Sequence, residues 1–313
     1  MADKRFATVA LIGLGLIGSS IARAVREALP GTILNGHDAD PGVRARAAEI
    51  GLVDRVAETA AEAVAGADLV IFCVPVGAMA DAARAVAGHV ARDAVVSDVG
   101  SPKAAVAAAL REALPDAAIV PAHPVAGTEN SGPDAGFAAL FRGRWCILTP
   151  ENGSGTNAVE RLSAFWTALG ARVEVMDPAH HDLVLAVTSH VPHLIAYTIV
   201  GTASDLERVT EGEVIKYSAG GFRDFTRIAA SNPTMWRDIF LSNKQAVLET
   251  LQRFSEDLFL LQRAIRDDDG DTLFDLFTRT RAIRRGIVEQ GQDVAKADFG
   301  RQTETADKGR APN

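Results

Sequence analysis

A glycine-rich turn near the N-terminus constrains the fold of this chain more than any other feature. Gly13, Gly15 and Gly18 have the spacing G-x-G-x-x-G and lie between an apolar strand pattern, Thr8–Ile12, and a helix pattern. The first glycine permits a tight turn, the second lets the backbone approach a pyrophosphate, and the third lets the helix pack closely on the strand. A bound pyrophosphate would lie at the helix N-terminus, where unpaired N–H groups and the helix dipole favour an anion.

Asp38 lies twenty positions after Gly18, at the end of the second strand pattern. Strand, glycines, helix and acid therefore occur in the register of a dinucleotide site, which argues against glycines that serve packing alone. A carboxylate at this point accepts hydrogen bonds from an adenosine ribose and repels a 2′-phosphate, so NAD is favoured. Arg44 and Arg46 lie nearby and keep NADP open as an alternative. The candidate cofactor-binding residues are Gly13, Leu14, Gly15, Leu16, Ile17, Gly18, Asp38, Val74 and Pro75.

Short β-branched runs alternate with alanine-rich helix patterns through the first 177 residues. The expected strands are Thr8–Ile12, Thr32–His37, Leu69–Val74, Ala94–Asp98, Ala118–Pro121, Trp145–Thr149 and Arg172–Met176. Near-continuous apolar strands separated by helices indicate a parallel sheet covered on both faces. From Pro178 onward the pattern is helical, most clearly over Ser242–Arg266, where apolar residues recur at steps of three and four. We therefore expect an α/β Rossmann-type nucleotide-binding domain at 1–177, an all-α domain at 178–290 and a frayed tail at 291–313.

Composition excludes several classes of function. The 313 residues carry 32 basic and 40 acidic side chains, a net charge of −8, which disfavours binding to nucleic acid or an anionic membrane but allows local basic pockets. No run reaches the roughly 18 apolar residues that a membrane span needs. The two cysteines cannot form a disulfide framework, and the apolar run around Cys73 indicates a buried, reduced thiol, which fits the cytosol.

His123 is the candidate catalytic residue. It opens the segment His123–Gly132 directly after an expected strand, and ligands of open α/β sheets bind beyond the carboxyl ends of the strands. An imidazole suits a general base that removes a hydroxyl proton as hydride departs, although a structural histidine that holds a loop is an open alternative. Ser101 also follows a strand. It is either the N-cap of a helix with Pro102 at the first helical position, or a hydroxyl that hydrogen-bonds His123 or the substrate.

The helical half carries two histidines three positions apart, His190 and His193. This spacing invites a metal site, but the chain has no H-E-x-x-H motif and no carboxylate between the two rings. One core histidine and one that reaches the active site is the favoured interpretation, and no metal is expected.

The segment Gly220–Asp238 holds candidate anion-binding residues. Arg223 and Arg227 are four positions apart, so they share a face if they lie on one helix, and an arginine fork binds a carboxylate through two hydrogen bonds. The alternative is surface pairing of Arg223 with Asp224 or Glu213. Gly220–Gly221 and Trp236 argue against a fully solvated face.

These strings together resemble the prephenate/arogenate (cyclohexadienyl) dehydrogenases of tyrosine biosynthesis. The resemblance extends from Gly13 to about Ile239, and it is carried most specifically by His123–Gly132 and Gly220–Trp236. It implies NAD-dependent oxidative decarboxylation of prephenate to 4-hydroxyphenylpyruvate, or of arogenate to tyrosine. It also implies that the helical domain forms a homodimer.

The resemblance implies a role for each matching residue. The histidine at 123 takes the substrate hydroxyl proton, and the serine at 101 hydrogen-bonds that histidine or the nicotinamide side; Pro102 is a small departure that puts the helix start in question. In the family, residues matching Thr128, Glu129 and His193 line the substrate pocket, and the arginine matching Arg227 binds a substrate carboxylate. The partner chain contributes to the pocket near Gly220, Asp224 and Trp236.

Two other functions remain open at this point. A dehydrogenase of the β-hydroxyacid type would lack the His123 segment and would place a catalytic lysine on the helical domain, where Lys216 and Lys244 are the candidates. A regulator that binds NAD without turnover would need a recognition helix with a basic face, and neither such a motif nor a basic charge is present.

Overall fold

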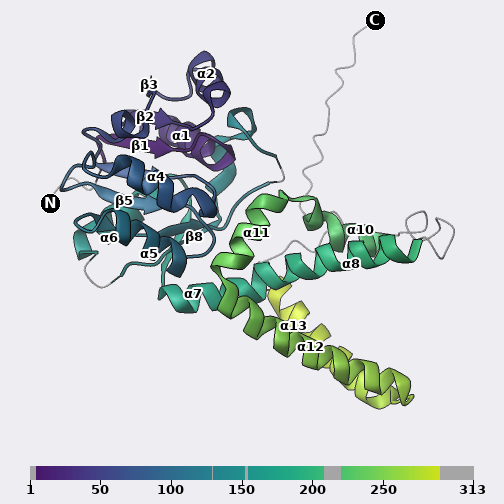
Figure 1. Ribbon diagram of the computed structural model, residues 1–313. Helices are drawn as coiled ribbons and strands as arrows, with labels where there is room; N and C mark the ends of the chain where they lie inside the picture. The colour runs from purple at the N-terminus through teal and green to yellow at the C-terminus, as the bar shows by residue number, and fades with distance from the viewer. Residues whose placement is uncertain (1–4, 129, 152–153, 208–219, 290–313) are drawn as a thin grey trace, which may run out of the picture.

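The computed structural model describes residues 5–128, 130–151, 154–207 and 220–289 of the protein (Figure 1). An α/β domain holds all of the strands in these ranges, and a helical domain follows, whose helices α8, α12 and α13 project away from it. The fold class expected from the sequence is confirmed. The tail expected at 291–313 lies outside the described residues.

Six parallel strands form the main sheet in the order β3-β2-β1-β4-β5-β6. Their bounds are Thr8–Ile12 (β1), Ile33–His37 (β2), Arg55–Val56 (β3), Leu69–Phe72 (β4), Val95–Asp98 (β5) and Ala118–Ile119 (β6). The strand order reverses between β1 and β4, the place where open α/β sheets bind their ligands. The short edge strand β3 was not expected, because two residues carry no periodic signal.

Alternation along the strands buries both faces of this sheet. Leu69 and Ile71 of β4 join one apolar core, whereas Val70 and Phe72 join a second core on the opposite face. Successive strand side chains point to opposite faces, so helices must cover both sides. The covering helices are Leu16–Ala28 (α1), Pro41–Glu49 (α2), Ala60–Val64 (α3), Met79–Val86 (α4), Ala104–Ala113 (α5) and Thr156–Ala168 (α6).

The remaining strands form a second sheet, which corrects the expectation of one parallel sheet. Strand β8 (Trp145–Leu148) pairs antiparallel with β7 (Ala122–Pro124) and parallel with β9 (Arg172–Val175). The sequence predicted a strand through Pro121, but β6 ends at Ile119 and the chain crosses to the second sheet. Proline has no N–H to donate to a ladder, which favours the crossing at this point. His123 therefore lies inside β7.

The helical domain begins with one long helix. It consists of α7 (Pro178–Leu185), a π-helical turn η4 (Ala186–His190) and α8 (Val191–Glu207), and the Asp177 carboxylate caps its N-terminus. The elements that follow are α10 (Gly220–Thr226), the 3₁₀ turn η5 (Arg227–Ala230), α11 (Pro233–Ser242), α12 (Lys244–Arg266) and α13 (Gly270–Glu289). The helix predicted at Ser242–Arg266 is α12, which starts two residues later, after Asn243.

By length and composition, the segment Pro178–Leu206 could cross a membrane, with a mean hydropathy of 1.6. Core helices pass the same test. His181, Asp182 and His190 within it are buried and hydrogen-bonded to other parts of the protein. These hydrogen bonds fix the first half of the segment in the interior of the folded protein.

Candidate active site

The turn between β1 and α1 has the shape that a dinucleotide phosphate requires. Gly13 has φ of +102°, and a Cβ added there would lie 2.5 Å from the carbonyl oxygen of Cys73. A Cβ added at Gly18 would lie 2.1 Å from the Gly13 carbonyl oxygen, whereas one added at Gly15 would meet nothing within 4 Å. No side chain in the described part of the chain caps the N-terminus of α1. The turn thus leaves open space and helix N–H groups where a pyrophosphate would bind, and it lies against the Cys73–Val74 backbone.

Asp38 lies beside this turn and its surroundings favour NAD over NADP. Its carboxylate accepts hydrogen bonds from Leu14 N at 2.8 Å and from Asp40 N at 3.0 Å, which leaves further lone pairs for ribose hydroxyls. Arg44 binds Glu58 and the Asp38 carbonyl, and Arg46 binds the Asp134 carboxylate through two nitrogens. Both arginines that could have held a 2′-phosphate are therefore committed to other partners.

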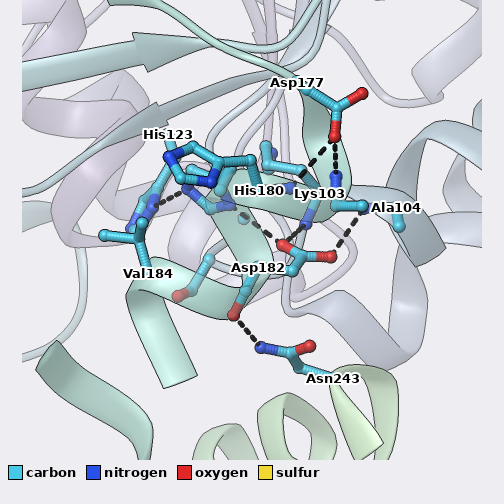
Figure 2. A network of polar contacts seen from close by, with 12 residues as sticks. Lys103, Ala104, His123, Asp177, His180, Asp182, Val184 and Asn243 are labelled. Carbon is cyan, nitrogen blue, oxygen red and sulfur yellow. Dashed lines mark hydrogen bonds and ion pairs between the residues drawn. The ribbon is translucent and has the colours of Figure 1, made fainter. Parts of the chain in front are cut away.

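A chain of hydrogen bonds runs from His123 into the helical domain (Figure 2). His123 Nδ1 lies 2.9 Å from His181 Nε2, and His181 Nδ1 lies 2.9 Å from Asp182 Oδ1. All three side chains are buried. His123 comes from β7, whereas the other two come from the first turns of α7. The two domains thus meet at the candidate base.

Burial lowers the pKa of His123 well below 6.5, and the neighbouring His181, Lys103 and His190 lower it further. A buried imidazolium would lose hydration and would face like charge. His123 is therefore neutral at pH 7 and ready to accept a proton.

A buried ion pair fixes the backbone just before His123. Lys103 Nζ lies 2.5 Å from Asp98 Oδ2 and donates to the Ala122 carbonyl oxygen at 2.7 Å, and both charged side chains are fully buried. The Asp98 carboxylate also accepts from Ala122 N at 3.2 Å and from Gly100 N at 2.7 Å. Residue 122 is thus held through both its N–H and its carbonyl group.

Ser101 makes no hydrogen bond to His123, which corrects one of its expected roles. Its Oγ lies 2.9 Å from His190 Nε2, and His190 Nδ1 lies 3.1 Å from Asn243 Nδ2. The Asn243 amide nitrogen also donates to the Asp182 carbonyl oxygen at 2.8 Å, so it must donate to His190 as well. His190, whose pKa burial lowers to about 4, is therefore neutral and protonated at Nε2. It donates to Ser101, whose own hydroxyl proton stays free for a bound molecule.

Ser101 is not the N-cap of α5 either. That helix begins at Ala104, and no side chain from its own N-terminal turn caps it. The Asp182 carboxylate does so from the other domain, accepting from Lys103 N at 2.7 Å and from Ala104 N at 3.0 Å. Pro102 lies outside the helix, before the N-cap position Lys103.

His193, Trp236 and Arg227 form the helical-domain part of the site. The rings of His193 and Trp236 stack with centroids 3.7 Å apart, and His190 meets the edge of the same indole at 6.1 Å. Burial lowers the pKa of His193 despite the Ser189 carbonyl that accepts from it, and the charge of Arg227 lowers it further. Arg227 itself is exposed on η5, from where its charge acts on His193. The buried Trp236 N–H has no hydrogen-bond partner among the described residues.

The other candidate substrate residues are not joined to this cluster by any hydrogen bond between described residues. Thr128 is exposed on the loop after β7, where its hydroxyl accepts from Asn130 N at 3.3 Å. Gly220 and Asp224 are exposed on α10, and Glu129 lies outside the described residues. Arg223 and Arg227 would share a face if they lay on one helix, but α10 ends at Thr226 and Arg227 starts a 3₁₀ turn.

The structure describes one of the two lysines behind the alternative dehydrogenase function. Lys216 and Glu213 lie outside the described residues, and Lys244 is exposed at the start of α12. Within the described ranges, no group of three or more histidine, cysteine or acidic side chains could hold a metal.

Sequence reasoning missed four residues of the site: Asp98, Lys103, His181 and Asp182. Each is a polar side chain in an otherwise apolar or alanine-rich stretch and is fully or almost fully buried. A charged residue at the end of a buried strand, such as Asp98, was the available signal, because it must find a partner in the interior.

The fold and the site define a two-domain dehydrogenase that uses a nicotinamide dinucleotide. Comparison with protein families is more specific: residues 21–175 match the nucleotide-binding domain of prephenate dehydrogenase, and residues 177–279 match its dimerization domain. The chain belongs to the prephenate dehydrogenase family, and it is an NAD-dependent oxidoreductase.

Relatives of known activity cover most of the chain. The cyclohexadienyl dehydrogenase of Zymomonas mobilis is 45% identical over 90% of this chain and 96% of its own length. The prephenate dehydrogenase of Bacillus subtilis is 34% identical over 90% of this chain and 76% of its own. The structure of Aquifex aeolicus prephenate dehydrogenase with hydroxyphenyl propionate and NAD+ has a TM-score of 0.84 and 32% identity, and it covers 90% of this chain and 98% of that one.

Proposed function

We propose that this enzyme oxidises and decarboxylates prephenate to 4-hydroxyphenylpyruvate, and that arogenate, which would give tyrosine, is its alternative substrate. The names of its relatives support this reaction. The observation that carries it in this chain is the neutral, buried His123 of β7, which hydrogen bonds through His181, Asp182 and Asn243 link to His190 and Ser101. Trp236 packs against His190.

The chain's own residues supply acid–base chemistry and binding. We assign to His123 the acceptance of the ring hydroxyl proton, and to the Ser101 hydroxyl a hydrogen bond to the substrate oxygen or to the nicotinamide side. Bound NAD+, held at Gly13–Gly18 and Asp38 with Val74 and Pro75 alongside, supplies the acceptor for the hydride. The carbonyl group that forms withdraws the electron pair of the breaking carbon–carboxylate bond, so carbon dioxide leaves as the ring becomes aromatic. The electron pair ends on the former carbonyl oxygen, which takes back the proton from His123 and becomes the phenol hydroxyl of the product.

The substrate is a dicarboxylate, and we assign its binding to the helical domain. Arg227 and the buried, unpartnered Trp236 N–H supply hydrogen-bond donors. His193 donates from Nδ1 to the Ser189 carbonyl, so its neutral ring offers Nε2 as an acceptor. We keep Thr128, Glu129, Gly220 and Asp224 as pocket residues on the family resemblance alone.

Initial rates decide the proposal. NADH formation should be followed with NAD+ or NADP+ and with prephenate or arogenate, and 4-hydroxyphenylpyruvate should be identified chemically. We expect turnover with NAD+ and prephenate and much weaker turnover with NADP+. Absence of NADH formation with both cyclohexadienols would refute the reaction.

Replacement of Arg227 by alanine should raise KM for prephenate by about 10- to 100-fold and change kcat little, because a charged hydrogen bond contributes about 1.5–3 kcal/mol to binding in both ground and transition states. Arg223→Ala is the matched control, since Arg223 is an exposed arginine four residues away. Steady-state kinetics of the two variants test the clamp, and an unchanged KM in Arg227→Ala argues against it.

The pH profile of kcat/KM should report the neutral His123. A base whose pKa is lowered works above that pKa and fails once protonated, so activity should stay level from pH 8 down to about 6.5 and fall only in more acidic solution. Measurements at constant ionic strength test this, and an acidic limb centred above pH 7 would show that His123 is not held neutral by its surroundings.

We also propose that a second copy of the chain covers the apolar faces of α12 and α13. Large apolar side chains are exposed there, among them Leu258, Phe259, Ile265, Phe274 and Phe277. Contiguous exposed apolar area marks an interaction site, and these residues lie in the segment that matches a dimerization domain.

Cys73 and Cys146 are free thiols, and Cys146 is buried. Reduced cysteines are typical of the cytosol, where we place the enzyme.

A further inference from the structure

In the buried hydrogen-bond chain His123–His181–Asp182, the protonation of each group decides which atom donates and which accepts. Burial opposes ionisation of Asp182, but hydrogen bonds from His181 and from the backbone N–H groups of residues 103 and 104 outweigh it and lower the pKa of Asp182. The ionised carboxylate only accepts, so His181 donates from Nδ1. Burial lowers the pKa of His181, so its ring is neutral and Nε2 carries a lone pair.

The protonation of His181 in turn fixes the tautomer of His123, the candidate base. His181 Nε2 can only accept, so His123 Nδ1 carries a proton and donates it. In a neutral imidazole the second nitrogen is then bare, so His123 Nε2 is free to take a proton. The opposite tautomer would present an N–H at Nε2 and could not act as a base.

We propose that His181 and Asp182 are positioning residues of this enzyme, which hold His123 in the orientation and the tautomer that leave Nε2 free. The proposal rests on the assignment of His123 as the base of the proposed reaction. Neither residue needs to touch the substrate.

The charged and titratable groups around the pair are Lys103 at the start of α5, Asp98 at the end of β5, and His190 in the π turn. Lys103 is paired with Asp98, and Asp182 closes the N-terminus of α5. The Asp182 backbone carbonyl also holds Asn243, which orients His190 toward Ser101. Figure 2 shows Asp182 between Lys103 and Ala104 on one side and Asn243 on the other. Asp182 of the helical domain is thus linked to His123 through His181, and to Ser101 through Asn243 and His190.

The first test is Asp182→Asn. Oδ1 of Asp182 accepts from both His181 Nδ1 and Lys103 N, so an amide nitrogen in its place would give up the Lys103 bond and donate to His181 Nδ1. That would move the His181 proton to Nε2 and the His123 proton to its own Nε2. We expect kcat to fall by about 10² to 10⁴, as when the carboxylate behind a catalytic imidazole is neutralised, with little change in NAD+ affinity. Wild-type kcat in a folded Asp182→Asn protein whose His123 proton lies on Nε2 would overturn the proposal.

The second test separates hydrogen bonding from packing. In His181→Gln, the amide oxygen can accept from His123 and the amide nitrogen can donate to Asp182, so kcat should stay within about tenfold of wild type. In His181→Leu, an apolar side chain fills the space without hydrogen bonds, and kcat should fall by about 100-fold or more with KM changed little. A purely structural role predicts the reverse order, because leucine suits a buried site better than glutamine. His180→Gln and His180→Leu are the matched controls, since His180 is the exposed neighbour.

The third test needs no turnover. Nitrogen NMR of ¹⁵N-histidine-labelled enzyme distinguishes the two ring nitrogens, and the His123 signals can be assigned by their loss in His123→Asn. We expect Nδ1 protonated and Nε2 bare in the wild type near pH 7, and the reverse in Asp182→Asn. Protonated Nε2 in the wild type would refute the positioning role even if prephenate is turned over. Bare Nε2 in an enzyme that does not turn over prephenate would refute the proposed function alone.

Discussion

Replacement of His123 by asparagine should lower kcat for prephenate by a factor of about 10² to 10⁴ and leave NAD+ binding intact. An amide can keep a hydrogen bond to His181, but it cannot accept the substrate proton. The dinucleotide turn at Gly13–Gly18 and Asp38 makes no hydrogen bond with His123, so the dissociation constant for NAD+ should change little. Initial rates give kcat, and calorimetric titration gives the affinity for NAD+.

His89→Asn is the matched control, because His89 is an exposed histidine on the α/β domain. It should keep wild-type turnover and wild-type affinity for NAD+. Near-wild-type kcat in His123→Asn would remove this histidine from the mechanism. A loss of NAD+ binding together with kcat would instead point to a disturbed fold.

Replacement of Lys103 by methionine should lower the free energy of unfolding by about 3–5 kcal/mol, the usual cost of leaving one member of a buried ion pair alone. Both side chains of the Lys103–Asp98 pair are fully buried. Loss of hydration raises the pKa of Asp98 and lowers that of Lys103, so each charge depends on the other. Without the ammonium group, the carboxylate keeps only its backbone donors at Gly100 and Ala122. Denaturant unfolding followed by circular dichroism measures the loss.

The double variant Asp98→Asn with Lys103→Met should recover part of that stability, since a neutral amide can still accept from one backbone N–H without a buried charge. Arg253→Met is the surface control, because the Arg253–Glu249 pair is exposed and contributes little. A loss below about 1 kcal/mol in Lys103→Met would mean that water reaches the pair and that it does not fix β7.

Much of the fold was predictable because its signals are local. The glycine spacing at 13–18 and the alternation along β4 depend on neighbours within a few positions, and the strand expected at Thr8–Ile12 agrees with β1. The second sheet was not predictable in the same way. The chain leaves the main sheet at Pro121, and the Asp98 carboxylate then holds the N–H of Ala122. The proline is a local signal, whereas Asp98 is distant in sequence.

The candidate site was predictable residue by residue but not in its contacts. His123, Ser101 and His193 were each found from a motif, whereas the partner of Ser101 proved to be His190 and not His123. The His123–His181 bond joins residues 58 positions apart, and the Ser101–His190 bond joins residues 89 positions apart. Both bonds therefore exist only once the two domains are docked. No periodicity in the sequence reports such a pairing.

From its sequence alone, this protein was determined to be a two-domain enzyme with a dinucleotide turn, an imidazole at the end of a sheet and arginines on a helical domain. Tertiary structure alone decided which nitrogen of His123 is free, because that depends on His181 and Asp182. His181 and His190 are nine residues apart, which in a regular α-helix would turn them about 180° from each other. The extra residue of the π turn η4 reduces that rotation to about 80°, so both rings reach the nucleotide-binding domain.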